Sequence, residues 1–236
     1  MAVRTKIVLD ELSPRRNPFK MLGESQIAPR DLEKIARSIA KLERETYRDT
    51  EVEETGFHGM LDTLRDEDLK YSAVIYDTNS GGTELGPYIG YVLAYTINPS
   101  HEDFTDAFEY VDDVIDRASR KARRGGASEI EKVEKMRQDV SSIQKELIRT
   151  SSPVVYANDA VRQRTDFAKQ ELNSFWSELF KRLKDAGAYL MASCRAETSY
   201  KVIKRLEQQG ILEIKLDVPD DDYFDDEIVH HVIVKF

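Results

Sequence analysis

Hydrophobic residues in the C-terminal third of the chain, from Ser151 to Phe236, alternate between strand-like and helix-like spacing. The pattern predicts four strands, at 154–157, 189–193, 211–218 and 228–236. It also predicts two helices, at 169–185 and 198–209, with Gly187 and Gly210 just beyond their ends. The elements therefore follow the order strand, helix, strand, helix, strand, strand, and an acidic turn at 219–227 joins the last two strands.

The N-terminal part of the chain has a similar alternation. Its hydrophobic spacing predicts a strand at 4–10, helices at 28–47 and 57–64, and strands at 71–77 and 88–98. Gly81, Gly82 and Gly86 form a glycine-rich turn between these two later strands. Residues 11–27 contain Pro14 and Pro18 and predict only an irregular backbone, as an ordered lid or a loose arm.

Residues 99–150 separate the two parts, and their apolar positions recur every three or four residues in two runs. The first run is Phe104, Phe108, Val111, Ile115 and Ala118, and the second is Ile130, Val133, Val140, Ile143 and Leu147. Gly125 and Gly126 lie between the runs, and Ser128 is predicted to cap the second helix. We expect an antiparallel helical hairpin, either packed on its own domain or presenting its outer face to a protein partner or a second copy.

This order of elements resembles the GCN5-related N-acetyltransferase (GNAT) superfamily, with one helical insertion. The resemblance implies a mixed α/β (α+β) fold in which a central sheet is flanked by helices. It divides the chain into the N-terminal half of a GNAT-like domain at 1–98, the inserted hairpin at 99–150 and the C-terminal half at 151–236. It also implies acetyl-CoA as the acyl donor and an amine, on a small molecule or a protein, as the acceptor.

The composition limits the cellular compartment and the classes of partner expected for this chain. The chain has 236 residues, one cysteine and a net charge of −9. A single cysteine excludes an intramolecular disulfide and gives no metal-ligand spacing, so we expect a reducing, cytoplasmic compartment. No apolar run approaches the roughly 20 residues that span a bilayer, so no membrane is expected as a partner. The acidic balance argues against nucleic-acid binding, except through a local basic patch.

In GNAT proteins, backbone N–H groups at a helix N-terminus hold the pyrophosphate of acetyl-CoA. The resemblance gives as cofactor-binding residues Val161, Arg162, Gln163, Arg164, Thr165, Ala168 and, on the next helix, Ser199. Gln163 and Ala168 match the family pattern. Asp166 departs from it, because its carboxylate stands where the family has a glycine that lets the backbone approach an anion.

The resemblance also indicates catalytic candidates. Asp159 is the nearest candidate for the general base that takes a proton from the attacking amine, although it also fits a structural role at a strand end, and Glu197 is the next. Leu206 stands where the family has the tyrosine that protonates the departing thiolate. Tyr200 is a nearby substitute for that tyrosine, or an amphipathic packing residue.

Two other residue types have simpler interpretations. Cys194 lies on or just after a predicted strand, where a buried thiol behaves as a small apolar group. His230 and His231 are neighbours on a strand and therefore face opposite sides, which argues against joint metal ligation.

Two charged clusters bear on the choice of acceptor and partner. The acidic one comprises Asp217, Asp220, Asp221, Asp222, Asp225, Asp226 and Glu227, and it fits either a solvated turn or a region that attracts a cationic amine such as a polyamine. The basic one, at the tip of the predicted hairpin, comprises Arg117, Arg120, Lys121, Arg123 and Arg124. It fits either a solvated helix end or a phosphate contact.

Two functions from different classes follow from these observations. The first is an N-acyltransferase that transfers an acetyl or other acyl group from acyl-CoA to an amine, and the element order, Gln163 and Ala168 favour it. The second is a catalytically inactive GNAT-fold protein that binds partners or has a structural role through its helical insertion. Asp166 and Leu206 favour the second function. Transfer from an aminoacyl-tRNA or another donor without CoA would explain the altered loop and the basic cluster together. We prefer the acyltransferase.

Overall fold

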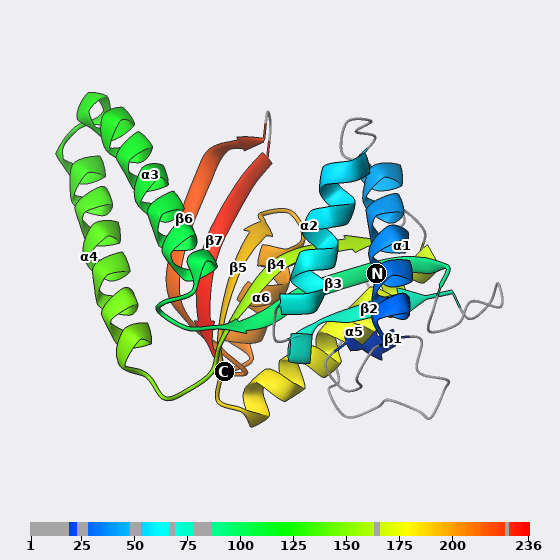
Figure 1. Cartoon of the computed structure of the whole chain (residues 1–236). Coiled ribbons are helices and arrows are strands. Elements are labelled where there is room, and N and C mark those ends of the chain that lie inside the picture. Colours follow the sequence, from blue (N-terminus) through cyan, green and yellow to red (C-terminus); the bar gives the residue numbers. More distant parts are fainter. Residues whose placement is uncertain are drawn as a thin grey trace, which may run out of the picture. The chain divides into compact units, whose positions relative to one another are not determined.

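The computed structural model describes residues 19–22, 28–47, 53–66, 69–77, 86–162, 166–224 and 227–236 (Figure 1). The chain forms two compact units. Unit 1 comprises residues 1–96 and 158–182, and unit 2 comprises residues 97–157 and 183–236. The division into 1–98, 99–150 and 151–236 expected from the sequence stays a prediction.

The described strands are β1 (Phe19–Met21), β2 (Ala73–Tyr76), β3 (Tyr88–Ile97), β4 (Val154–Arg162), β5 (Tyr189–Arg195), β6 (Glu213–Phe224) and β7 (Glu227–Lys235). The described α-helices are α1 (Pro29–Tyr47), α2 (Glu53–Asp66), α3 (Glu102–Gly125), α4 (Ala127–Arg149), α5 (Asp166–Asp185) and α6 (Ser199–Gln208). Hydrogen-bonded strands follow the order β1-β2-β3-β4-β5-β7-β6. Because β4 and β5 are parallel while β5, β7 and β6 are antiparallel, the sheet is mixed. The predicted mixed α/β (α+β) fold class, with a central sheet flanked by helices, is confirmed.

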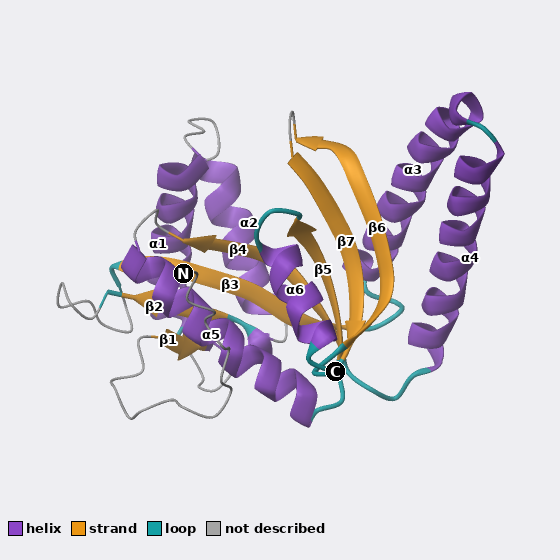
Figure 2. Cartoon of the chain, turned by 180° about the vertical axis from the view of Figure 1, so that it is seen from behind, coloured by secondary structure: helices purple, strands orange, loops and turns teal. Residues whose placement is uncertain are grey.

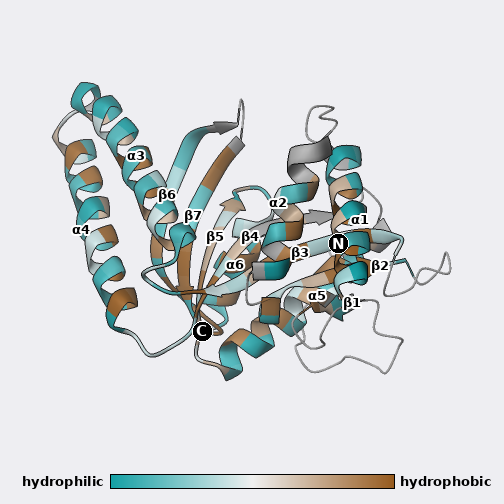
Figure 3. Cartoon of the chain, viewed as in Figure 1, coloured by the Kyte–Doolittle hydropathy of each residue, from teal (hydrophilic) through white to brown (hydrophobic). Residues whose placement is uncertain are grey.

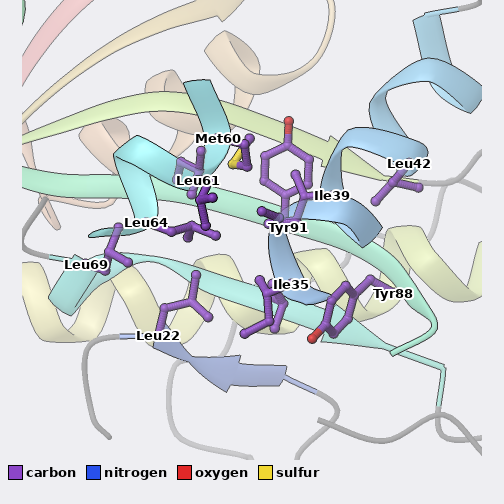
Figure 4. Close-up of a cluster of buried hydrophobic side chains, with 13 residues drawn as sticks. Leu22, Ile35, Ile39, Leu42, Met60, Leu61, Leu64, Leu69, Tyr88 and Tyr91 are labelled. Carbon is purple, nitrogen blue, oxygen red and sulfur yellow. The ribbon is translucent and has the colours of Figure 1, made fainter. Parts of the chain in front are cut away.

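Unit 1 contains an antiparallel ladder of β1, β2 and β3, against which α1 and α2 bury their apolar stripes. Figure 4 shows Ile35 and Ile39 of α1 in the same cluster of buried side chains as Leu61 and Leu64 of α2. Leu42 belongs to this cluster too and lies further along α1. Each such aliphatic side chain contributes about 1.5–3 kcal/mol when fully buried. The burial of these stripes explains why the predicted helix at 28–47 forms as α1.

Some N-terminal predictions need correction. The backbone at 11–27 was expected to be irregular, but Phe19–Met21 forms β1 and pairs with Ala73–Ile75 of β2. A hydrogen-bonded strand partner from elsewhere in the chain therefore outweighs the local sequence signals. The helix predicted at 57–64 begins earlier, at Glu53. The strand predicted at 4–10 lies outside the described residues.

Unit 2 is built on the ladder of β5, β7 and β6, whose outer strand is longer than predicted. The acidic turn expected at 219–227 is wrong for its first part, because β6 continues through Pro219 to Phe224. Asp220 pairs with Val229 across this ladder, and the carboxylate of Asp220 is buried. The strand continues there because partners on another element compensate that carboxylate, as described below.

The inserted hairpin consists of α3 and α4, which run side by side next to β6 (Figures 1 and 2). Apolar residues of both predicted runs are buried: Phe104, Phe108, Val111, Ile115, Val133, Val140, Ile143 and Leu147. Figure 3 shows hydrophobic and hydrophilic positions interspersed along both helices. The predicted cap Ser128 is wrong, because α4 begins at Ala127 with Gly126 as its N-cap. None of the described helices combines the length and apolarity that a membrane span requires.

Gly126 adopts φ 109° and ψ −179°. Residues with a side chain rarely adopt this backbone conformation, so any substitution of Gly126 is strained. We expect Gly126→Ala to lower the free energy of unfolding by about 1–3 kcal/mol. Urea unfolding followed by circular dichroism measures this change.

Gly59→Ala is the matched control for this prediction. Gly59 lies inside α2, and beyond the local backbone of that helix no atom lies within 4 Å of an added Cβ. Alanine there is expected to raise the free energy of unfolding by about 0.5–1 kcal/mol, because it favours the helix. Equal losses at both positions would contradict the assignment of a special backbone conformation to Gly126.

Candidate functional site

A cavity of about 280 Å³ lies in unit 2 between α3 and the ladder of β5, β7 and β6. Its lining residues come from four strands and one helix: Asp106, Ala107, Phe108, Tyr110, Val111, Tyr156, Met191, Ala192, Ser193, Leu216, His231, Val232 and Ile233. Strand alternation explains the polar groups on this wall, because Met191 and Ser193 of β5 share one face and pair with Ile233 and His231 of β7. We call this side of the ladder the α3 face.

Ser193 and His231 form the polar centre of the α3 face. They are direct cross-strand partners, and Ser193 Oγ lies 2.9 Å from His231 Nδ1. The imidazole is buried, and burial lowers the pKa of His231 below its ordinary value of 6.5. The ring is therefore neutral at pH 7, which allows it to accept a proton.

Asp220 lies on the other side of the same imidazole. Its Oδ2 is 3.7 Å from His231 Nε2, and its side chain is only 1% exposed. The same oxygen accepts hydrogen bonds of 2.9 Å from Tyr110 and from Arg117 of α3, while Oδ1 accepts one from the Asp222 N–H. These donors favour the ionised carboxylate and lower the pKa of Asp220 despite its burial.

The hydroxyl of Tyr110 remains a hydrogen-bond donor in this cluster. Burial and the acceptor Asp220 raise the pKa of Tyr110 to about 12, so the phenol stays protonated at neutral pH. The ring of Tyr110 also meets the imidazole of His231 edge-on, with 5.0 Å between their centroids. Residues of the inserted hairpin therefore complete the surroundings of His231.

The two charged clusters noted in the sequence meet each other. Lys121 Nζ lies 2.8 Å from Asp221 and 3.0 Å from Asp222, next to the pair of Arg117 with Asp220. Two residues of the basic cluster, Arg117 and Lys121, therefore form ion pairs with β6 instead of facing only solvent. The acidic residues at 220–222 are compensated within unit 2, which weakens their expected attraction for a polycationic acceptor.

The opposite side of the ladder faces α6, which Figure 2 shows in front of β5 when the chain is viewed from behind. Tyr200 of α6 donates its hydroxyl proton to Asp217 and stacks on His230, with 3.6 Å between the ring centroids. His230 Nδ1 lies 2.7 Å from Asp217 Oδ1. The expectation that His230 and His231 face opposite sides is confirmed, since each meets its own aspartate.

Cys194 also lies near the α6 side, where it pairs with His230 across the ladder. Burial raises the pKa of the Cys194 thiol to about 11, so the thiolate is disfavoured at neutral pH. This agrees with its expected behaviour as a small apolar group and argues against a nucleophilic role.

The residues predicted to bind cofactor are distributed over three elements. Val161 and Arg162 end β4, Ala168 is buried in α5, and Ser199 begins α6. Gln163, Arg164 and Thr165 lie outside the described residues. Their assignment to the donor remains a prediction.

The predicted catalytic residues are likewise dispersed. Asp159 lies in β4, while Glu197 is exposed between β5 and α6 and bonds to Lys201. Tyr200 lies in α6 and bonds to Asp217, as described above. Sequence reasoning overlooked Ser193, His231, Asp220 and Tyr110 as one group. The available signal was a pair of consecutive histidines on a strand, opposite an acidic segment with no local partners.

No protein-family model matches the sequence, and no curated protein sequence matches it either. Nineteen solved chains do match the structure. Arylalkylamine N-acetyltransferase 2 from Aedes aegypti has 12% identity over 92% of this chain and 97% of its own, with a TM-score of 0.48. A mosquito arylalkylamine N-acetyltransferase-like 5b has 14% identity, coverage of 87% and 95%, and a TM-score of 0.44.

An agmatine N-acetyltransferase is also similar, with 12% identity, coverage of 89% of this chain and 97% of its own, and a TM-score of 0.44. At such identities and TM-scores, the likenesses identify neither the reaction nor the substrate of this chain.

Arg117→Met tests whether the hairpin holds the site together through Asp220. The substitution keeps an apolar stem but removes the cation facing a buried carboxylate, so the free energy of unfolding should fall by about 3 kcal/mol. Urea unfolding at pH 7 measures this loss. Arg137→Met is the control, because Arg137 pairs with the exposed Asp116 and should cost less than about 1 kcal/mol. Similar losses for the two variants would contradict a special role for the Arg117–Asp220 pair.

Proposed function

We propose that this protein is an N-acyltransferase that moves an acyl group, such as acetyl, from acyl-CoA to a primary amine. The observation that carries the proposal is a neutral, buried imidazole, His231, held between Ser193 and Asp220 at the wall of a cavity. An amine must lose a proton when it attacks a thioester, and a neutral histidine within reach is the usual proton acceptor.

The cavity adjoins the parallel pair of strands in unit 2. Tyr156 of β4 and Met191 of β5 are register partners in that pair, and both line the cavity. The proposal therefore places the reacting amine beside the part of this strand pair that belongs to unit 2.

The reaction is a direct transfer without a covalent enzyme intermediate. The amine nitrogen bonds to the thioester carbonyl carbon, the carbon–sulfur bond breaks, and CoA leaves as the thiolate. The proton lost by the amine passes to His231, directly or through the hydroxyl of Ser193. Asp220 stabilises the resulting imidazolium, and its own bonds to Arg117 and Tyr110 keep it ionised.

Tyr200 receives no proton-transfer role in this proposal. The hydroxyl of Tyr200 donates a hydrogen bond to Asp217, and burial together with this acceptor raises the pKa of Tyr200. A phenol in that state is a poor acid for the departing thiolate. Asp159 and Glu197 remain predicted alternatives for the base, but the exposed Glu197 bonds to Lys201.

The donor site depends on residues at the start of α5. A helix of 20 residues offers unpaired N–H groups at its N-terminus for the CoA pyrophosphate. Asp166 begins this helix and stands where the family pattern has a glycine. The proposal therefore expects weaker CoA binding than a glycine there would give.

A non-catalytic binding protein is the second candidate function. Ile130 and Ile148 of α4 are 42% and 53% exposed, and their spacing of 18 residues returns them to one side of the helix. Such a surface on the inserted hairpin would contact a protein partner or a second copy. This candidate predicts that acyl-CoA does not bind.

Calorimetry with acetyl-CoA separates the two functions. We expect the wild-type protein to bind acetyl-CoA with a micromolar dissociation constant and Asp166→Gly to bind about tenfold more tightly, because one repulsive charge is removed. Circular dichroism verifies that both proteins are folded. No binding by either protein would sink the acyltransferase proposal, and binding only by the variant would favour the non-catalytic candidate.

His231→Gln tests the proton acceptor. The variant keeps hydrogen-bonding capacity but cannot accept the proton, so kcat/KM for acetyl transfer should fall about 100-fold or more. Protonation of the amine lowers the rate of both proteins as the pH falls. The wild-type rate should show a further decline that begins only below pH 6.5, since burial lowers the pKa of His231, and the variant should lack this further decline. The charged and titratable groups near this ring are Asp220 of β6, Tyr110 and Arg117 of α3, and the neighbouring His230.

His230→Gln is the matched control, because the same change is made one residue away on the opposite side of the strand. It should retain at least about one third of the activity. Using the same amine throughout removes the contribution of amine protonation from the comparison. Equal losses in both variants would show that His231 acts through the strand's stability rather than as the base.

A further inference from the structure

Ser193, His231 and Asp220 lie in a row on the α3 face, in the order of a nucleophile, a base and an acidic group that orients the base. Ser193 Oγ is 2.9 Å from His231 Nδ1, and Asp220 Oδ2 is 3.7 Å from His231 Nε2. The two contacts involve different nitrogens of one ring, so the imidazole lies between the hydroxyl and the carboxylate. Such a group is recognised by its geometry and not by sequence position or fold.

The carboxylate of Asp220 determines which nitrogen of His231 carries the proton. An ionised carboxylate only accepts hydrogen bonds, and those from Tyr110 and Arg117 keep Asp220 ionised. A neutral ring therefore has its N–H on Nε2, toward Asp220, and keeps the lone pair of Nδ1 for Ser193. The hydroxyl of Ser193 consequently donates to Nδ1, which is the direction in which its proton moves when the oxygen attacks a substrate.

A substrate can reach the hydroxyl, whereas the base behind it is protected. Ser193 is exposed and lines the cavity of about 280 Å³, while His231 is buried. The ring of Tyr110 packs edge-on against the imidazole. Ser193 and His231 are direct partners across β5 and β7, so the strand ladder fixes the separation of nucleophile and base.

The cavity next to Ser193 suits a small uncharged acyl group. Apolar side chains form much of its wall, among them Phe108, Val111, Leu216 and Ile233. An ester of a small carboxylic acid is uncharged and apolar over most of its surface, and its carbonyl carbon is open to attack by an activated hydroxyl. The described residues therefore bring an activated serine and space for an ester together.

We propose that Ser193 is a nucleophile and that this protein hydrolyses small carboxylic esters through an acyl-serine intermediate. In the first step, Ser193 Oγ bonds to the carbonyl carbon, its proton passes to His231 Nδ1, and the bond to the leaving oxygen breaks. His231 gives that proton to the leaving group. In the second step, a water oxygen bonds to the acyl carbon and a water proton passes to His231. The bond to Ser193 Oγ then breaks, and the hydroxyl regains its proton from His231. Asp220 is a positioning residue that stabilises the imidazolium in both steps.

This activity is separate from the proposed acyl transfer. It needs neither acyl-CoA nor an amine, because the ester supplies the acyl group and water accepts it. In acyl transfer the bound amine attacks the thioester directly, whereas an ester in a site without an amine meets the hydroxyl of Ser193. Both reactions use His231 as the proton acceptor, so an assay that contains neither CoA nor an amine distinguishes them.

The first experiment measures hydrolysis of 4-nitrophenyl acetate by the full-length protein in phosphate buffer. We expect Ser193→Ala and His231→Gln each to lower kcat/KM by about 100-fold or more, because one removes the nucleophile and the other its base. Ser142→Ala, at an exposed position of α4, and His230→Gln are the matched controls. Each control should change kcat/KM by less than about threefold, and circular dichroism verifies that all four variants are folded.

Covalent labelling then identifies the nucleophile itself. A fluorophosphonate reacts with an activated serine by forming a bond between the serine oxygen and phosphorus, with loss of fluoride. Intact-mass spectrometry should show about one label per chain, and peptide mapping should place it on Ser193. The label should be absent from Ser193→Ala and should form about tenfold or more slowly in His231→Gln, because the base that activates the hydroxyl is missing.

The outcomes separate this inference from the proposed acyl transfer. Ester hydrolysis that is equal in the wild-type protein and Ser193→Ala would overturn the inference, and so would a label on another residue or no label at all. Hydrolysis and labelling that depend on Ser193, without any acetyl transfer from acetyl-CoA, would support the inference and overturn the acyl transfer. Acetyl transfer without hydrolysis or labelling would do the opposite.

Discussion

The Asp220 carboxylate is the group on which unit 2 depends. A carboxylate that is 1% exposed is costly to bury unless donors compensate it, and the donors here come from a helix more than a hundred residues earlier in the chain. Arg117 and Tyr110 therefore connect the inserted hairpin to the outer strand of the ladder. The same carboxylate stands beside His231, so one interaction supports both the packing of α3 and the electrostatics of the cavity.

The ladder of β5, β7 and β6 keeps two sets of polar groups apart. Ser193, His231 and Asp220 lie on the α3 face with the cavity, whereas Cys194, His230 and Asp217 lie on the side of α6. On the α6 side, His230 and Tyr200 both bond to Asp217, and the ring of Tyr200 stacks on His230. Their arrangement is that of a satisfied packing cluster. On the α3 face, by contrast, the imidazole of His231 lines a cavity that can hold a ligand.

Much of the fold could be predicted from hydrophobic spacing, and the hairpin is the best example. The spacing of Phe104, Phe108, Val111 and Ile115 marks the buried side of α3 without reference to any other element. The length of β6 could not be predicted in that way, because its acidic residues look like a turn until Arg117 and Lys121 are placed beside them. The candidate site was overlooked for the same reason, since Ser193, His231 and Asp220 meet only through strand register.

The register of β7 determines which of the two adjacent histidines, His230 or His231, faces the cavity. Because successive side chains of a strand point to opposite faces, a shift of β7 by one residue would bring His230 into the cavity and turn His231 toward α6. The irregularities between Ile214 and Leu216 and between Asp220 and Phe224 set which residues of β6 face which side of β7. Inserting or deleting a single residue in β7 would therefore exchange the two imidazoles between environments while leaving the composition of the strand almost unchanged.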